Sequence, residues 1–324
     1  MRMHLLGLPV AAVVCAALGA ACDSTEPPNP GTGGTSSTGG APSGGQTGSG
    51  GAAAIGGAAS GGKATGGKAT GGASSGGTAT GGKATGGSGG KPFKGVANSP
   101  AGEIAALGAT WCYNWGTSPQ ATDCDDPYFV PMVRGRGDVA AAIQRVAAAG
   151  YTTVLGFNEP NKADQDNLTV AQAIALWPAM TSNPDLRVSS PAVSDDGRAW
   201  LVDFMNQVKA NGLRVDFIAM HWYGWNAGSC TAGQLEGAVN WAQQWGLPVW
   251  VTEFGCMGSS NPDEQTLLNF FPAAVAMLRD KHPLVERYAW YPWNTYNNLY
   301  SPNASNVRVI TALGQLFAAA PAYR

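Results

Sequence analysis

Two glutamates stand at the ends of apolar runs, where a buried strand has no use for a charge. Glu159 closes the run "TTVLGFNE" and precedes Pro160, and Glu253 closes the run "PVWVTE". Hydrolysis of a glycosidic bond needs two carboxyl groups, because one donates a proton to the departing oxygen while the other attacks the anomeric carbon. Retaining enzymes hold such groups about 5–5.5 Å apart. Glu159 and Glu253 are therefore predicted to be a catalytic pair.

Aromatic and hydrogen-bonding side chains gather at the same strand ends. The C–H faces of a pyranose are apolar and stack on flat rings, while amides and imidazoles bind its hydroxyls. His221 could instead act as a base or a metal ligand, although a histidine in such a position more often forms a hydrogen-bonding wall of the pocket. Trp225 is also expected at the rim of the site. The tryptophans expected in the core are Trp177, Trp200, Trp241, Trp245 and Trp250. The predicted substrate-binding residues are Tyr113, Asn114, Trp115, Asn158, His221, Trp222, Tyr223, Trp290 and Trp293.

Distant strand ends meet only in certain folds, so the order of elements matters. Short runs rich in Val, Ile and Phe alternate with amphipathic stretches, which predicts a parallel sheet in an α/β fold. Eight such units fit a (β/α)₈ barrel of the TIM type, whose active sites lie at the carboxyl ends of the strands. The first run is short and polar, and without it the barrel would be irregular or the sheet open. The expected strands are 94–98, 109–115, 128–133, 152–158, 187–193, 215–223, 248–255 and 287–293.

Side-chain alternation treats the two glutamates differently. Glu253 shares a face with Val251, which suits an inward direction. Along a regular strand Glu159 would point to the face opposite Asn158, and so away from the pocket. Both reach a common pocket only if the strand bends at its end, and Pro160 favours such a bend.

The N-terminal part of the chain has the composition of a targeting signal followed by a tether. Residues 1–21 are predicted to be an export signal, because Arg2 precedes an apolar run and small residues come before Cys22. Cys22 after "LGAA" resembles the bacterial lipobox, in which the cysteine is lipidated; plain secretion is the alternative. Residues 22–91 hold more than half of the 46 glycines and are predicted to be a disordered linker, with a glycosylated stalk as the alternative. Residues 92–324 are the predicted catalytic domain.

Composition also restricts the partners. The formal net charge is −2 with acidic and basic residues interspersed, which argues against nucleic acid. No metal or organic cofactor is expected, since there is no CxxC spacing and only His221 and His282 lie in the folded part. We expect a monomer that contacts a membrane only through the N-terminal lipid anchor.

Four cysteines remain for the exported domain, and an oxidising compartment favours disulfides between them. Three pairings are possible. Cys112 with Cys124 would close a short loop, and Cys230 with Cys256 would join the loops that follow neighbouring strands. We expect that pairing, with free buried thiols as the alternative.

Seven motifs in order resemble glycoside hydrolase family 128, the catalytic-core family that includes fungal alkali-sensitive-linkage proteins. The resemblance covers about residues 93–318, nearly the whole folded part. The motifs are "YNWG" (113–116), "FVPMV" (129–133), "LGFNEPN" (155–161), "SPAV" (190–193), "VDFIAMHWYG" (215–224), "VWVTEFG" (249–255) and "RYAWY" (287–291).

The resemblance implies a barrel glycosidase that cleaves β-1,3-glucan with retention. It implies that Glu159 is the general acid/base and Glu253 the nucleophile. It further implies that Asn158 binds the sugar 2-hydroxyl and that His221 and Tyr223 line the cleavage subsite. The chain departs from the family after the first strand, where "GVANSPAG" lacks the usual aromatic residues.

Three functions therefore compete. The first is an exported endo-β-1,3-glucanase, either secreted or held at the cell surface. The second is a barrel glycosidase for another β-glucan linkage, and the third is a non-catalytic glucan-binding surface protein. The sequence does not decide between endo and exo action or fix the natural glucan.

Overall fold

The computed structural model describes residues 90–120, 124, 128–226, 228–257, 263–292 and 297–324. The predicted export signal, Cys22, the linker up to residue 89 and Trp293 lie outside these residues. Within them, no helix combines the length and hydropathy that a membrane span requires.

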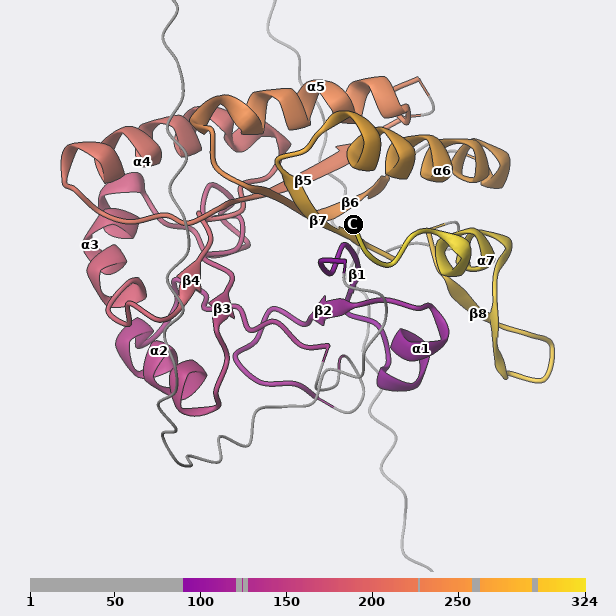
Figure 1. The fold of residues 1–324 in the computed structure, drawn as a ribbon, viewed down its shortest axis with the longest axis horizontal. Helices are drawn as coiled ribbons and strands as arrows, with labels where there is room; N and C mark the ends of the chain where they lie inside the picture. The colour runs from indigo at the N-terminus through magenta and orange to yellow at the C-terminus, as the bar shows by residue number, and fades with distance from the viewer. Residues whose placement is uncertain (1–89, 121–123, 125–127, 227, 258–262, 293–296) are drawn as a thin grey trace, which may run out of the picture. The chain divides into compact units, whose positions relative to one another are not determined.

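Strands and helices alternate along the described chain, as the sequence pattern predicts (Figure 1). The strands are β1 (Lys94–Ala97), β2 (Trp111–Tyr113), β3 (Thr153–Val154), β4 (Arg187–Val188), β5 (Ile218–Gly224), β6 (Val249–Cys256), β7 (Val285–Trp290), β8 (Tyr300–Pro302) and β9 (Arg308–Ile310). The helices are α1 (Ala101–Ala106), α2 (Val139–Ala148), α3 (Val170–Met180), α4 (Arg198–Ala210), α5 (Ala232–Ala242), α6 (Glu264–Lys281) and α7 (Ala312–Ala319), with short 3₁₀ turns η1 (Asp195–Gly197) and η2 (Gln243–Trp245).

Helix ends follow the local sequence signals. Thr169 caps α3 through a capping box with Gln172, in which each side chain serves the other residue's backbone N–H. Asp138 caps α2 by accepting from Ala141 N, and Gly150 in the left-handed region (φ +83°) follows the end of that helix. These caps fix where the two helices begin and end, and therefore where the loops that join them to the strands begin.

Five strands form a parallel sheet in the order β2-β1-β7-β6-β5. The weakest predicted strand is confirmed, because β1 pairs with β2 on one side and with β7 on the other. β3 and β4 form a separate parallel pair. β8 and β9 form an antiparallel hairpin before α7.

Isolated parallel bridges connect the five-stranded sheet to the β3–β4 pair. On one side Phe129 bridges Cys112 and Met132 bridges Leu155, so the predicted strand 128–133 is reduced to single contacts. Pro131 between them has no backbone N–H to donate, which prevents a regular ladder. On the other side the segment after β4 bridges β5 at Val193–Met220 and the preceding loop at Ser189–Phe217. Segments far apart in sequence thus bring their carboxyl ends to one edge.

Two apolar clusters surround these strands. The larger cluster lies between the strands and the helices, and the helices α2 to α6 form an arc around the strands in Figure 1. A second cluster is made of residues that face away from the helices, where Trp250 contacts Trp111 (ring centroids 5.2 Å apart) and Phe217 (4.4 Å). Buried rings of this size contribute about 3 kcal/mol or more each when compared with alanine. They hold the strand ends rigidly enough to carry a site.

Lys94 joins the first strand to the last helix. Its side chain is buried, and its ammonium donates to the carbonyls of Phe317, Ala318 and Ala320 at 2.9, 3.0 and 2.9 Å. These carbonyls lie at the end of α7, where helical N–H donors run out, although Phe317 O also accepts from Ala320 N at 3.1 Å. A cation is also favoured at that end by the helix dipole.

Replacing Lys94 by methionine is expected to lower the free energy of unfolding by about 2 kcal/mol, since buried carbonyls lose their donor. Chemical denaturation measures this change directly. Lys209→Met, at an exposed lysine of α4, is the matched control and should leave stability unchanged. Equal stability of the two variants would contradict the proposed role of the ammonium.

Candidate active site

Glu253 lies on β6 and is held by three hydrogen-bond donors. Its Oε1 accepts from the Tyr113 hydroxyl at 2.8 Å and from Trp115 Nε1 at 2.9 Å. Its Oε2 accepts from the Tyr223 hydroxyl. The residue is only 4% exposed, and burial together with the Glu253 charge raises the pKa of both tyrosines well above the usual value. The tyrosines therefore stay protonated as donors, and the carboxylate is fixed in one orientation.

Glu159 reaches the same place through a turn in the backbone. It adopts φ +40°, in the left-handed region, and its N–H donates to Ala192 O at 2.7 Å. This conformation is strained for a residue with a Cβ, at a cost of about 1–3 kcal/mol. The expected bend before Pro160 is thus present, and it brings Glu159 into the cleft that Asn158 also lines.

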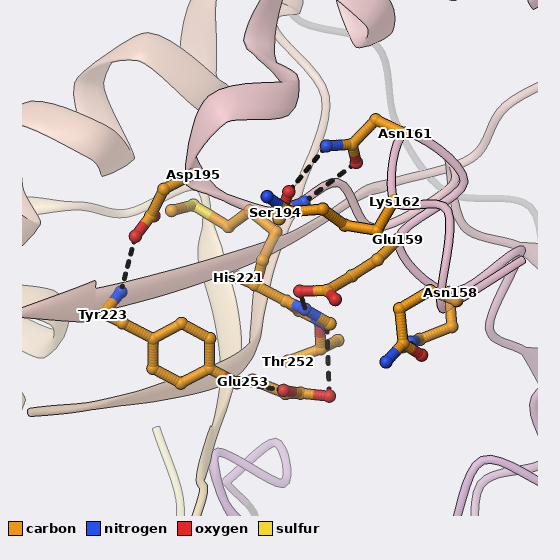
Figure 2. Close-up of polar contacts among 12 residues, drawn as sticks. Asn158, Glu159, Asn161, Lys162, Ser194, Asp195, His221, Tyr223, Thr252 and Glu253 are labelled. Carbon is orange, nitrogen blue, oxygen red and sulfur yellow. Dashed lines mark hydrogen bonds and ion pairs between the residues drawn. The ribbon is translucent and has the colours of Figure 1, made fainter. Parts of the chain in front are cut away.

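His221 joins the two glutamates. Its register against β6 shifts after Met220, which sets it beside Glu253. Nδ1 lies 3.2 Å from Glu159 Oε1, and Nε2 lies 3.4 Å from Glu253 Oε1 at an ion-pair distance without hydrogen-bond alignment. Figure 2 shows the two carboxylates on either side of the imidazole ring. One buried side chain therefore fixes the relative position of both candidate catalytic groups.

Asp166 supports the segment that carries Asn158 and Glu159. Its carboxylate accepts from the backbone N–H of Asn158 at 2.9 Å and of Gly135 at 2.8 Å, and from Arg134 Nε at 2.6 Å. The Asn158 side chain donates to Gln165 at 3.2 Å. Its Oδ1 is buried and has no hydrogen-bond partner among the described residues, so this oxygen can accept from a bound molecule.

Several of these residues line a cleft of about 1170 Å³, which is larger than the usual range for a small ligand. Trp115 and Tyr291, which both line the cleft, contact each other edge to face with ring centroids 5.8 Å apart. Sequence reasoning missed several of the lining residues. Asp195 is one of them. It lies just after the run "SPAV" (190–193), as Glu159 lies at the end of its own run, so its place near a strand end could have identified it as a site residue. The lining residues are Asn114, Trp115, Arg134, Asn158, Glu159, Lys162, Asp164, Gln165, Ser194, Asp195, Asp196, Tyr223, Trp225, Glu253, Met257 and Tyr291.

Comparison with known proteins identifies the family of this arrangement. A family model described as "Glycosyl hydrolase catalytic core" matches residues 92–323. This chain belongs to glycoside hydrolase family 128. The match to a catalytic-core model and to solved glucanases of the family makes it a glycoside hydrolase, in agreement with two carboxylates facing one cleft.

Individual relatives agree with the family assignment. Alkali-sensitive linkage protein 1 of Schizosaccharomyces pombe is 31% identical over 193 residues, which are 57% of this chain and 34% of that protein. The chain thus spans about a third of the length of that relative. A subgroup I endo-β-1,3-glucanase of Amycolatopsis mediterranei, solved in complex with laminaritriose, is 33% identical and has a TM-score of 0.63 over 71% of this chain and 100% of its own. A subgroup II endo-β-1,3-glucanase of Sorangium cellulosum is 28% identical, with a TM-score of 0.59 over 72% of this chain and 100% of its own.

Two predicted substrate contacts of the family 128 hydrolase are wrong. Trp222 is buried against Phe270, with ring centroids 5.6 Å apart, because it alternates away from its inward neighbours on β5. Trp290 is fully buried, packs edge-on against Phe254, and donates its indole N–H to Asn297 O at 2.8 Å. Tyr291, the next residue, lines the cleft instead.

The other predicted contacts that the structure describes lie at the site, and Trp293 lies outside the described residues. Tyr113, Trp115, His221 and Tyr223 surround Glu253. Asn114 lines the cleft from a turn, in which its Oδ1 accepts from Gly116 N.

The predicted disulfides are confirmed. Cys112 pairs with Cys124 at a Cα–Cα distance of 6.0 Å, and Cys230 pairs with Cys256 at 5.5 Å. Cys256 ends β6, the strand that carries Glu253. The second disulfide therefore braces the loop after β5 against the strand of the candidate nucleophile.

His221 is expected to make stability depend on pH. Burial alone lowers the pKa of the imidazole, but the charges of Glu253 and Glu159 outweigh burial and raise this pKa above the ordinary value. A group with a raised folded-state pKa stabilises the protein below its unfolded-state pKa, about 6.5 for histidine, and this contribution is lost as pH rises through the folded-state pKa.

The measurement is the melting temperature of the natural protein and of His221→Gln across a pH series. The advantage of the natural protein should be largest below about pH 6.5 and should shrink at higher pH. A difference that stays constant with pH would mean that His221 does not carry the charge.

Proposed function

We propose that this glycoside hydrolase is an endo-β-1,3-glucanase that works by double displacement. The observation that carries the proposal is the convergence of Glu159 and Glu253 on His221 inside an open cleft. Two solved structures to which the chain is similar are named endo-β-1,3-glucanases, and one of them holds laminaritriose. A cleft of about 1170 Å³ supports binding of an oligosaccharide segment.

In the first step Glu253 attacks the anomeric carbon while Glu159 donates its proton to the leaving oxygen. The C1–O bond to the leaving sugar breaks and an ester forms between C1 and a Glu253 oxygen. Tyr113 and Trp115 keep one oxygen of Glu253 occupied, so the other oxygen, bound by Tyr223, is the one that must exchange its donor for the sugar carbon. In this scheme Tyr223 changes partner during the reaction.

In the second step Glu159, now ionised, takes a proton from water as the water attacks C1. The ester bond breaks, Glu253 regains its charge, and the product keeps the β configuration. Asn158 Oδ1, which has no hydrogen-bond partner among the residues that the structure describes, is an acceptor for a hydroxyl of the bound sugar. His221 positions both glutamates throughout, because it contacts each of them.

We also infer that the eight predicted strand segments close into a (β/α)₈ barrel. The parallel sheet, the β3–β4 pair and the isolated bridges between them support closure, since each segment has a neighbour on both sides. The catalytic residues then come from the carboxyl ends of several strands, as in other barrel enzymes.

Export and surface attachment remain proposals from the sequence. Residues 1–21 would direct export, Cys22 would carry the lipid and residues 22–91 would form the tether. Lys91 pairs with Arg324 before β1 begins, at the end of the strands opposite the cleft. A tether attached there would leave the cleft free to meet an insoluble glucan. Loss of membrane-fraction protein in Cys22→Ala would support the anchor, and unchanged fractionation would contradict it.

The proposed function is tested by activity on curdlan, laminarin, lichenan and cellulose. We expect curdlan and laminarin to be cleaved to mixed oligosaccharides. Cleavage of lichenan or cellulose alone would indicate another linkage, and glucose as the sole early product would indicate exo action. Binding of glucan without new reducing ends would indicate a non-catalytic binding protein.

A further inference from the structure

Trp225 is the most exposed large apolar side chain of the cleft. It lies one residue beyond β5, is 56% exposed, and lines the cleft together with Glu159. We propose that Trp225, held in place by Asp195, is the stacking platform for the sugar on the leaving-group side of the scissile bond. This inference rests on the proposed function and adds a specific ligand contact to it.

The indole is fixed although it is exposed. Its Nε1–H donates to Asp195 Oδ2 at 2.8 Å, and its ring meets Tyr223 edge to face with centroids 5.7 Å apart. Asp195 also accepts from the backbone N–H of Tyr223 at 3.3 Å, so one carboxylate ties the ring to the strand. A ring held in one orientation binds a sugar face without losing further rotamer freedom.

Asp195 is half-buried, in an environment that disfavours the charged form of a carboxylate. Burial raises its pKa, although the hydrogen bonds from Trp225 and Tyr223 oppose that effect. A carboxylate placed in this way has a use in orienting its partners. The orientation of the Trp225 ring is the feature of the cleft that depends on it most directly.

The side of the cleft follows from the position of the proton donor. The leaving sugar must lie beside Glu159, since this residue protonates the leaving oxygen. Figure 2 shows Asn161, Lys162, Ser194 and Asp195 on the Glu159 side of His221, with Glu253 on the other side.

This side also carries an ordered set of polar groups. Asp196 accepts from Lys162 Nζ at 2.7 Å and from Ser194 Oγ at 2.6 Å, and Asn161 Nδ2 lies 2.6 Å from Ser194 Oγ. An aromatic face next to such groups matches the two chemistries of a glucosyl residue, an apolar C–H face and a rim of hydroxyls. Trp115, which donates to Glu253, and Tyr291 form the aromatic surface for the sugar that is attacked, and Tyr223 lies between this surface and Trp225.

The test compares a substrate that fills the leaving-group side with one that does not. Laminarihexaose leaves an oligosaccharide, whereas β-laminaribiosyl fluoride leaves only fluoride. Trp225→Ala should lower kcat/KM on laminarihexaose by about 10- to 100-fold, the effect of losing one large apolar contact that the sugar covers. The loss on laminarihexaose should exceed the loss on the fluoride by about tenfold or more.

Further variants separate stacking from general damage. Trp225→Phe keeps a ring and should retain most of the preference, and Asp195→Ala, which frees the indole, should give an intermediate loss with the same substrate pattern. Tyr323→Ala removes an exposed ring near the opposite end of the strands and should leave kcat/KM on both substrates unchanged. Equal losses on the two substrates, or no loss on laminarihexaose, would overturn the inference. A natural protein that cleaves neither substrate would instead mean that the proposed function is wrong.

Discussion

Glu253→Ala is expected to lower kcat on laminarin by about 10⁴-fold or more, because the covalent route disappears with the nucleophile. The fold should survive with a lower melting temperature, since Tyr113, Trp115 and Tyr223 lose a shared buried acceptor while the apolar core is unchanged. Added azide should restore cleavage of an activated substrate by attacking C1 from the space that Glu253 leaves. The azide product should therefore have the α configuration.

Activity, product configuration by NMR and melting temperature together decide this prediction. Glu264→Ala, at an exposed glutamate in the first turn of α6, is the matched control and should keep normal turnover. Near-normal activity of Glu253→Ala, or a β-glycosyl azide product, would contradict the assignment of the nucleophile.

Glu159→Ala should behave differently, because it removes the proton donor and leaves the nucleophile in place. We expect a loss of about 10²- to 10⁴-fold on laminarin, the usual contribution of general acid–base catalysis. The loss should be much smaller in the first step with β-laminaribiosyl fluoride, since fluoride departs without needing the same proton transfer. Azide should now attack the glycosyl–enzyme ester and give a β-glycosyl azide, opposite to the Glu253 variant.

Single-turnover measurements separate the two steps for Glu159→Ala. A burst of fluoride followed by slow turnover is the expected pattern, because the second step also needs Glu159 as a base. Equal losses on laminarin and on the fluoride would show that Glu159 acts in some way other than proton transfer.

The arrangement of strands was predictable because buried parallel strands are written as apolar runs. The strand ends then located Glu159, Glu253, His221 and Tyr223 without further information. The segment 128–133 was predicted too long, since Pro131 interrupts its hydrogen bonding while the apolar pattern continues.

The facing of individual rings was harder to predict, and alternation explains the errors. Tyr223 lines the cleft and His221 contacts both glutamates from the same face of the strand, so Trp222 between them must point outward. On β7 the small residue Ala289 marks the inward face, and a small side chain gives no signal of this kind. Trp290 therefore looked like a rim residue, while Tyr291 took that place.

Other features of the site depend on contacts between residues distant in sequence. Asp195 gains its importance from Trp225, and Asp166 from Arg134 and the backbone of Asn158. The left-handed conformation of Glu159 is a backbone property that a following proline favours only indirectly. None of these follows from periodicity alone.

The assignment of Glu253 as nucleophile and Glu159 as proton donor is tested most directly by trapping the intermediate. A 2-deoxy-2-fluoro-β-laminaribiosyl fluoride should react once per active site and then turn over slowly, because the fluorine at C2 destabilises both transition states. The reagent loses its anomeric fluoride and keeps the fluorine at C2. Peptide mass spectrometry should therefore find one 2-fluoro-laminaribiosyl ester on the peptide that contains Glu253. Label on Glu159 or on another carboxylate, or inactivation without any glycosylated peptide, would contradict the account.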